Sequence, residues 1–122
     1  MIDVSKYIGL PYKVGSTDCW GLIRMVYADH LGIALPEYAG IVMGPAVNDL
    51  IEGLLESMQW VEAVVPEPYD VILLRDGRRL HIGMVVDTDQ MLHTVENKNA
   101  CLERFTRPYW APSIIGFYQY AG

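Results

Sequence analysis

One cysteine and two histidines are the side chains whose types and spacing most favour chemistry in this sequence of 122 residues. Cys19 lies at the predicted start of a helix, where unpaired backbone N–H groups and the helix dipole favour a thiolate over a thiol. A lone cysteine is more often a small buried apolar residue, so the interpretation depends on its partners. His81 opens one predicted strand, and His93 lies in the next. We therefore expect Cys19 to be a nucleophile and His81 its base.

The spacing of the two histidines predicts that they share one face of a sheet. They are 93 − 81 = 12 residues apart, and Asp87 is the midpoint. A hairpin folded about Asp87 would place them directly opposite each other, with Cβ atoms roughly 4.5–5.5 Å apart. A two-residue turn at Thr88-Asp89 would direct them to opposite faces, so the pairing requires a loop of odd length or a bulge. His93 would then bond the far nitrogen of His81 and hold its tautomer.

A metal site is the main competing explanation for a cysteine with two histidines. A structural zinc site has four ligands and usually contains a close pair such as Cys-x-x-Cys, which this sequence lacks. Cys101 could in principle add a fourth ligand, or form one disulfide with Cys19 in an oxidising compartment. We expect it instead to be a core or surface residue of a strand, because nothing else indicates a disulfide-dependent fold. A glycine-rich phosphate loop is also lacking, so we expect no metal and no cofactor. His30 falls in the last helical turn, where the helix dipole explains a cation.

The elements expected to position these residues are helices first and strands second. Asp18 can cap a helix that runs to Leu31 and ends at Gly32 in a left-handed conformation. Residues 33–46 read as a loop, and Asn48 to Met58 as a second helix. This order predicts an α+β fold with an antiparallel sheet, in a single domain spanning residues 1–122. The predicted strands are Trp60–Val65, Asp70–Leu74, His81–Val86, Met91–Val95, Cys101–Arg104 and Ser113–Tyr120.

Composition excludes several classes of partner. The net charge is −6, from 15 acidic and 9 basic residues, so neither nucleic acid nor an anionic membrane surface is an expected partner. No apolar stretch approaches the length that crosses a bilayer. The first residues lack a basic start followed by an apolar run, so we expect no signal peptide and synthesis in the cytoplasm.

Several sequence blocks together resemble the NlpC-type cysteine peptidases, a bacterial and phage branch of the papain-like fold. Tyr69 stands where that family usually has Gly, and Trp20 where most members have Ser. The resemblance implies a nucleophile-bearing helix packed on an antiparallel sheet. Glycines 15 and 21 would leave room for a substrate backbone. The blocks are Gly9-Leu10-Pro11-Tyr12, Asp18-Cys19-Trp20-Gly21-Leu22-Ile23, Tyr69-Asp70-Val71-Ile72-Leu73, His81-Ile82-Gly83-Met84-Val85-Val86, Met91-Leu92-His93 and Tyr109-Trp110.

The resemblance implies cleavage of the peptide stems of bacterial peptidoglycan, often beside D-glutamate and diaminopimelate, through a thioester acyl-enzyme. It implies that Cys19 is the nucleophile, His81 the base and His93 the orienting residue. Tyr12 would line the site, and we also expect Asp18 and Trp20 to contact substrate.

Members with Trp at position 20 look like phage tail-associated versions. This implies tail proteins as partners and delivery to the cell wall by a virion. Two alternatives remain open at this point. One is a non-catalytic structural or assembly module of a phage tail, and the other is a related amide hydrolase or acyltransferase toxin.

Overall fold

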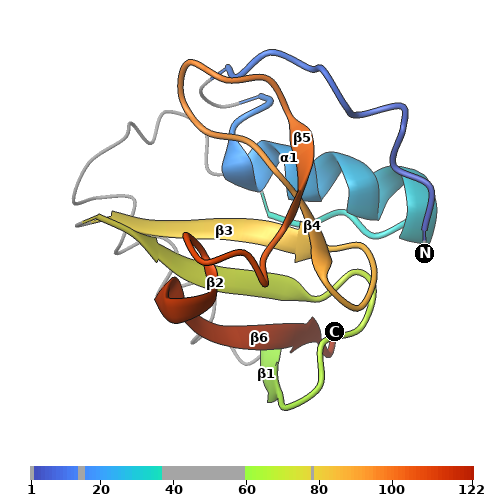
Figure 1. Cartoon of the computed structure of the whole chain (residues 1–122). Helices are drawn as coiled ribbons and strands as arrows, with labels where there is room; N and C mark the ends of the chain where they lie inside the picture. Colours follow the sequence, from blue (N-terminus) through green and yellow to red (C-terminus); the bar gives the residue numbers. More distant parts are fainter. Residues whose placement is uncertain (1, 14–15, 37–59, 78) are drawn as a thin grey trace.

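A computed structural model describes residues 2–13, 16–36, 60–77 and 79–122. Within these ranges, one helix packs on a six-stranded antiparallel sheet of order β1-β6-β2-β3-β4-β5 (Figure 1). The predicted α+β fold is confirmed. The elements are α1 (Cys19–Val26), a π-helical continuation η1 (Tyr27–Leu31), β1 (Trp60–Ala63), β2 (Val71–Asp76), β3 (Arg79–Val85), β4 (Gln90–His93), β5 (Cys101–Arg104), the short helix η2 (Ala111–Ser113) and β6 (Ile114–Tyr120).

The observed bounds agree closely with the predicted ones. Asp18 caps α1 by accepting a hydrogen bond from the Gly21 N–H at 2.7 Å, and Gly32 ends the helical segment in the left-handed region, at φ 66°. The predicted helix from Asn48 to Met58 lies outside the described residues, as does most of the predicted loop before it. None of the helices in the described ranges is long and apolar enough to cross a membrane.

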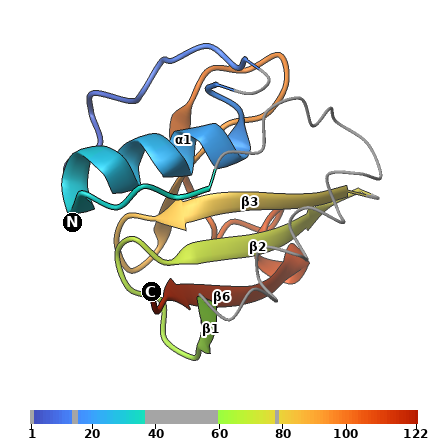
Figure 2. The same cartoon turned by 180° about the vertical axis from the view of Figure 1, so that it is seen from behind.

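Two hydrophobic clusters cover the two faces of the sheet. α1 lies alongside β3 on one face (Figures 1 and 2), where Val71 and Leu73 of β2 point toward it. The alternate residues Ile72 and Leu74 join the second cluster on the other face, with Trp110. Burial on both faces explains why β2 is a continuous apolar run rather than an alternating one.

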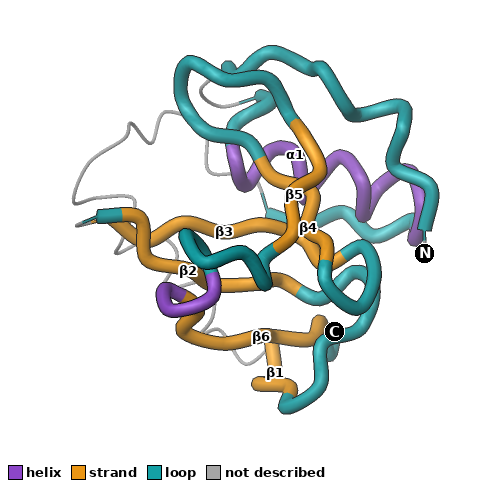
Figure 3. Tube along the Cα trace, in the orientation of Figure 1, coloured by secondary structure: helices purple, strands orange, loops and turns teal. Residues whose placement is uncertain are grey.

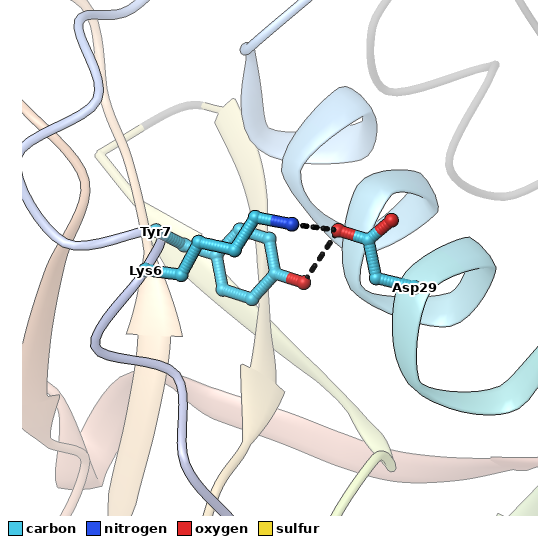
Figure 4. Close-up of polar contacts among 3 residues, drawn as sticks. All are labelled: Lys6, Tyr7 and Asp29. Carbon is cyan, nitrogen blue, oxygen red and sulfur yellow. Dashed lines mark hydrogen bonds and ion pairs between the residues drawn. The ribbon is translucent and has the colours of Figure 1, made fainter.

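Hydrogen bonds attach the N-terminal segment both to the helical segment and to the β4–β5 connection. Tyr7 donates its hydroxyl to Asp29 in η1 at 2.7 Å, and Lys6 pairs with the same carboxylate at 3.0 Å (Figure 4). Further along, Gly9 N–H donates to the Ala100 carbonyl at 2.8 Å. Lys6 is largely exposed, so its ion pair stabilises the fold little, whereas Tyr7 is 1% exposed and anchors the segment. These contacts fix the segment that immediately precedes Tyr12.

The backbone conformation of Tyr69 is one that glycine adopts more easily than other residues. Its φ is 75°, in the left-handed region that costs a residue with a Cβ atom free energy. Hydrogen bonds hold it there: its N–H donates to the Val85 carbonyl at 2.9 Å, its carbonyl accepts from the Tyr27 hydroxyl, and its own hydroxyl bonds His30 Nδ1 at 3.0 Å. His30 thus has a structural contact, as expected for it.

The β3–β4 hairpin is folded one residue away from the predicted centre. Met84 lies opposite Leu92, which centres the hairpin on Thr88 instead of Asp87. Residues 87–89 form the loop, so the required odd length is met and the side-chain faces are preserved. Beyond this pairing β4 and β5 run steeply across the direction of β3 (Figure 3), which opens the sheet beside the first half of β3.

Gly21 makes room for the loop before α1, not for substrate as expected. A Cβ atom there would lie 1.9 Å from the Ser16 carbonyl oxygen and 3.0 Å from Asp18 Oδ1. The close approach is what lets Asp18 cap the helix at its first turn.

We expect Gly21→Ala to lower the free energy of unfolding by about 2–3 kcal/mol, because the added methyl must displace backbone. Gly116→Ala is the matched control, since its Cβ would meet only the Tyr118 side chain, at 3.4 Å, and should cost less than about 1 kcal/mol. Urea denaturation of both variants measures the difference. Equal costs would contradict the assignment.

Candidate active site

A pocket of about 260 Å³ brings Cys19 and His81 together. Cys19 enters it from the first turn of α1 and remains partly exposed. His81 enters from β3, where the sheet opens. The other lining residues are Tyr12, Asp76, Arg79, Leu80, Thr94, Val95, Glu96 and Asn97.

The histidines form a hydrogen-bonded chain that ends on a carboxylate. His81 Nε2 lies 2.9 Å from His93 Nδ1, and His93 Nε2 lies 2.8 Å from Glu103 Oε1. Both rings are buried, at 6% and 4% exposure. The structure therefore joins the two histidines singled out in the sequence and adds a third member.

The two histidines are diagonal neighbours, so the prediction that they lie directly opposite each other is wrong. The register of β3 and β4 continues to place Gly83 opposite His93, and Gly83 lies two positions along β3 from His81. A Cβ atom on Gly83 would lie 3.2 Å from His93 Cβ. Diagonal side chains on one face are within reach of each other when they are long or aromatic, which explains the bond that forms.

Trp110 fixes the planes of both rings. Its indole stacks on His81, with centroids 5.6 Å apart and planes at 24°, and meets His93 edge-on at 5.6 Å and 88°. Trp110 is itself 4% exposed. The imidazoles therefore have little freedom to rotate, which is a requirement for a positioned base.

Burial keeps the histidines neutral. Desolvation, followed by the neighbouring His93, lowers the pKa of His81 to about 3, against a weaker opposing effect of Asp76. Desolvation also lowers the pKa of His93, although Glu103 opposes it. A neutral imidazole at neutral pH can accept a proton.

Burial also keeps the thiol protonated, contrary to the expected thiolate. Desolvation and then the Asp18 carboxylate raise the pKa of Cys19 to about 12, outweighing hydrogen bonds from the backbone N–H groups of Cys19 and Trp20. The helix N-terminus thus acts in the predicted direction, but it is the weaker effect. The pocket therefore holds a neutral thiol and a neutral imidazole at rest, so any attack by the sulfur would need a proton transfer from Cys19 to accompany it.

Tyr12 faces the thiol. Burial, and next the negative charge of a Cys19 thiolate, raise the pKa of Tyr12 to about 12. Its hydroxyl therefore stays protonated and can donate a hydrogen bond into the pocket.

Asp18 and Trp20 have structural contacts where the sequence favoured contact with substrate. Asp18 caps α1, as described above. Trp20 is buried with the core cluster, its Nε1 donates to the Pro36 carbonyl at 2.8 Å, and its ring meets Trp60 edge-on. Neither residue is among those that line the Cys19 pocket.

The remaining thiol lies beside the histidine chain. Both cysteines are free. Ligand atoms of His93, Cys101 and Glu103 lie within 4.8 Å of one another, which makes them the group in the described ranges that could hold a metal. However, His93 and Glu103 already bond each other, and the positive charge of Lys98 acts on both His93 and Cys101, so the arrangement suits hydrogen bonding between the side chains better than metal binding.

Sequence reasoning missed Glu103 and the packing role of Trp110. The turn signal at residues 97–99 could have identified Glu103. A hairpin centred on Asn97 pairs Cys101 with His93, as observed, and alternation then places Glu103 on the same face. Trp110 follows an irregular segment, and no local pattern indicates what its ring contacts.

Three comparisons relate the chain to known proteins. A model of the NlpC/P60 family matches residues 9–119. A gamma-DL-glutamyl hydrolase of Bacillus subtilis (strain 168) is 24% identical over 93% of this chain and 27% of the relative. A crystal structure of a lipoprotein-like NLP/P60 family protein from Staphylococcus aureus subsp. aureus Mu50 superimposes with a TM-score of 0.66 at 22% identity, over 96% of this chain and 38% of the other. The chain thus spans little more than a quarter of the curated relative.

The protonation states predict how Cys19 reacts with pH. Because its pKa is raised to about 12, the rate of alkylation by iodoacetamide should rise about tenfold per pH unit between pH 6 and 9. Mass spectrometry of a Cys101→Ser variant isolates the reaction at Cys19. A rate that is already at a plateau below pH 6 would reveal a preformed thiolate–imidazolium pair and contradict this assignment.

Proposed function

The chain belongs to the NlpC/P60 family, and from that premise we propose that it is a cysteine hydrolase that cleaves the peptide stems of bacterial peptidoglycan. In this proposal Cys19 is the nucleophile, His81 the base and His93 the residue that orients His81. The observation that carries it is the shared pocket of Cys19 and His81, with His81 held by the 2.9 Å bond to His93.

The reaction begins with transfer of the Cys19 proton to His81 as the sulfur attacks the scissile carbonyl carbon. The Cys19 backbone N–H at the helix start, together with the Tyr12 hydroxyl, would stabilise the resulting oxyanion. His81 then gives the proton to the leaving amine as the C–N bond breaks, which leaves a thioester. Water attacks the thioester with His81 again as base, and the carboxylic acid departs.

One cation in the pocket, Arg79, supports a substrate with a free carboxylate. Arg79 lines the pocket beside Cys19, together with the acids Asp76 and Glu96. The Bacillus subtilis relative is named for gamma-DL-glutamyl hydrolysis. A glutamyl residue linked through its side chain keeps a free α-carboxylate, which a guanidinium can bind bidentately. We therefore favour a γ-glutamyl amide as the bond cleaved.

We further propose that a phage or prophage tail carries the protein to the cell wall. The support is Trp20, which stands where most family members carry Ser and resembles the tail-associated versions. The large indole packs in the core, so the substitution does not alter the pocket lining itself.

The central test is digestion of purified cell walls, analysed by mass spectrometry of the released peptides. We expect the wild-type chain to hydrolyse γ-glutamyl amide bonds, which leaves glutamate with both carboxylates free on one side of the cut and a new free amine on the other. Cys19→Ala should reduce the rate by more than about 10³-fold, because no other nucleophile replaces the sulfur. Cys101→Ser serves as the control and should retain activity. Release that persists in Cys19→Ala would eliminate the proposal.

Arg79 tests the substrate class separately. Arg79→Gln should raise KM for a γ-glutamyl peptide by about tenfold while kcat changes little, because a carboxylate contact made equally in substrate and transition state affects binding alone. Arg75→Gln, on the exposed side of β2, is the matched control. An unchanged KM in Arg79→Gln would remove the carboxylate contact from the proposal.

A further inference from the structure

We propose that Glu103 is a positioning residue that fixes the tautomers of both histidines and so determines which nitrogen of His81 is the base. The inference rests on the proposed function only where it assigns His81 as the base of a reaction. The tautomers themselves are properties of the resting protein and can be tested without a substrate.

The geometry is a chain of three groups in line. Glu103 Oε1 lies 2.8 Å from His93 Nε2, and His93 Nδ1 lies 2.9 Å from His81 Nε2. The side chain of His93 is 4% exposed and that of Glu103 is 26% exposed. His93 therefore has both ring nitrogens engaged, one by a carboxylate and one by an imidazole, inside the protein.

Hydrogen-bond chemistry then assigns the protons. An ionised carboxylate can only accept, so His93 Nε2 carries the proton of that ring. A neutral imidazole has one N–H, so His93 Nδ1 presents a lone pair and must accept from His81 Nε2. His81 Nε2 thus holds the proton of its own ring. The nitrogen left with a lone pair is His81 Nδ1, which becomes the atom that receives the Cys19 proton.

The same chain stabilises the charge that the reaction creates. When the thiol proton reaches His81 Nδ1, the ring becomes a cation and its Nε2–H bond to His93 strengthens. His93 is polarised in turn toward the Glu103 carboxylate. No proton needs to leave the chain, and when His81 Nδ1 returns its proton to the leaving amine the three groups regain their starting state.

Other charged groups near His93 do not replace Glu103. Asp76 of β2 and Lys98 in the β4–β5 loop act on the ring electrostatically, in opposite directions, and Cys101 lies across from it on β5. Tyr109 bonds Asp76 at 2.9 Å. Glu103 is the carboxylate that contacts a ring nitrogen of His93 in the described part of the chain.

Nuclear magnetic resonance of the imidazole nitrogens tests the tautomers directly. In a ¹⁵N-labelled Cys19→Ala protein at neutral pH, both His81 and His93 should show a protonated Nε2 and an unprotonated Nδ1. Adding Glu103→Ala should convert His93, and with it His81, to a mixture of tautomers. Single Nε2–H tautomers that persist in Glu103→Ala would overturn the proposal.

Kinetics provide the second measurement. With a γ-glutamyl peptide or cell walls, Glu103→Ala should lower kcat by about 10- to 100-fold with KM within about twofold, because the base is mispositioned but the pocket is intact. Glu103→Gln should lie between Ala and wild type, since its amide oxygen can accept the same bond without the charge. Glu62→Gln, on the exposed edge strand β1, is the control.

The outcomes separate this inference from the proposed function. Loss of wall cleavage in every form of the protein, with the tautomers as predicted, would reject the substrate and keep the role of Glu103. Wild-type kcat in a folded Glu103→Gln and Glu103→Ala pair would reject the role of Glu103 and keep the substrate. Thermal unfolding of each variant identifies any loss of kcat that is due to misfolding. If Glu103→Ala does not fold, the kcat of Glu103→Gln tests the role of Glu103.

Discussion

The rest of the site depends on one buried hydrogen bond, between His81 Nε2 and His93 Nδ1. It forms because the β3–β4 loop has three residues, which directs both side chains to one face of the sheet. Gly83 leaves room for His93, since a Cβ atom at position 83 would lie 3.2 Å from His93 Cβ. Trp110 packs against both rings, which are almost fully buried, so the bond is made in a low-dielectric setting.

Desolvation accounts for the chemistry of the resting site. The same burial that holds the histidines in place lowers the pKa of His81 to about 3 and raises that of Cys19 to about 12. A buried site therefore favours neutral partners over an ion pair, despite the helix dipole. If His81 acts as the proposed base, its ring must be in the correct tautomer when the thiol proton is transferred, and the Glu103 carboxylate at the far end of the chain would set that tautomer.

The position of Cys19 is set by contacts at both ends of the helical segment. The Asp18 cap and the close approach of Gly21 to the preceding loop fix the first turn of α1. Tyr7 donates a hydrogen bond to Asp29 in η1, and this bond holds the N-terminal segment that leads to Tyr12. The N-terminal segment and the helical segment are thus bonded to each other, and the pocket of Tyr12, Cys19 and His81 lies beside them.

The sequence by itself determined the α+β fold, the capped helix that begins at Cys19, and the strands that carry His81 and His93. These are consequences of local rules: capping, hydrophobic period and turn residues act over a few positions. The turn signal at residues 97–99 places Glu103 on the face of His93. Only the tertiary structure decided that the Glu103 carboxylate bonds that ring, that His81 and His93 are diagonal and that Trp20 belongs to the core. Register, burial and the protonation that follows from burial depend on atoms brought together from distant parts of the chain, and no local pattern encodes them.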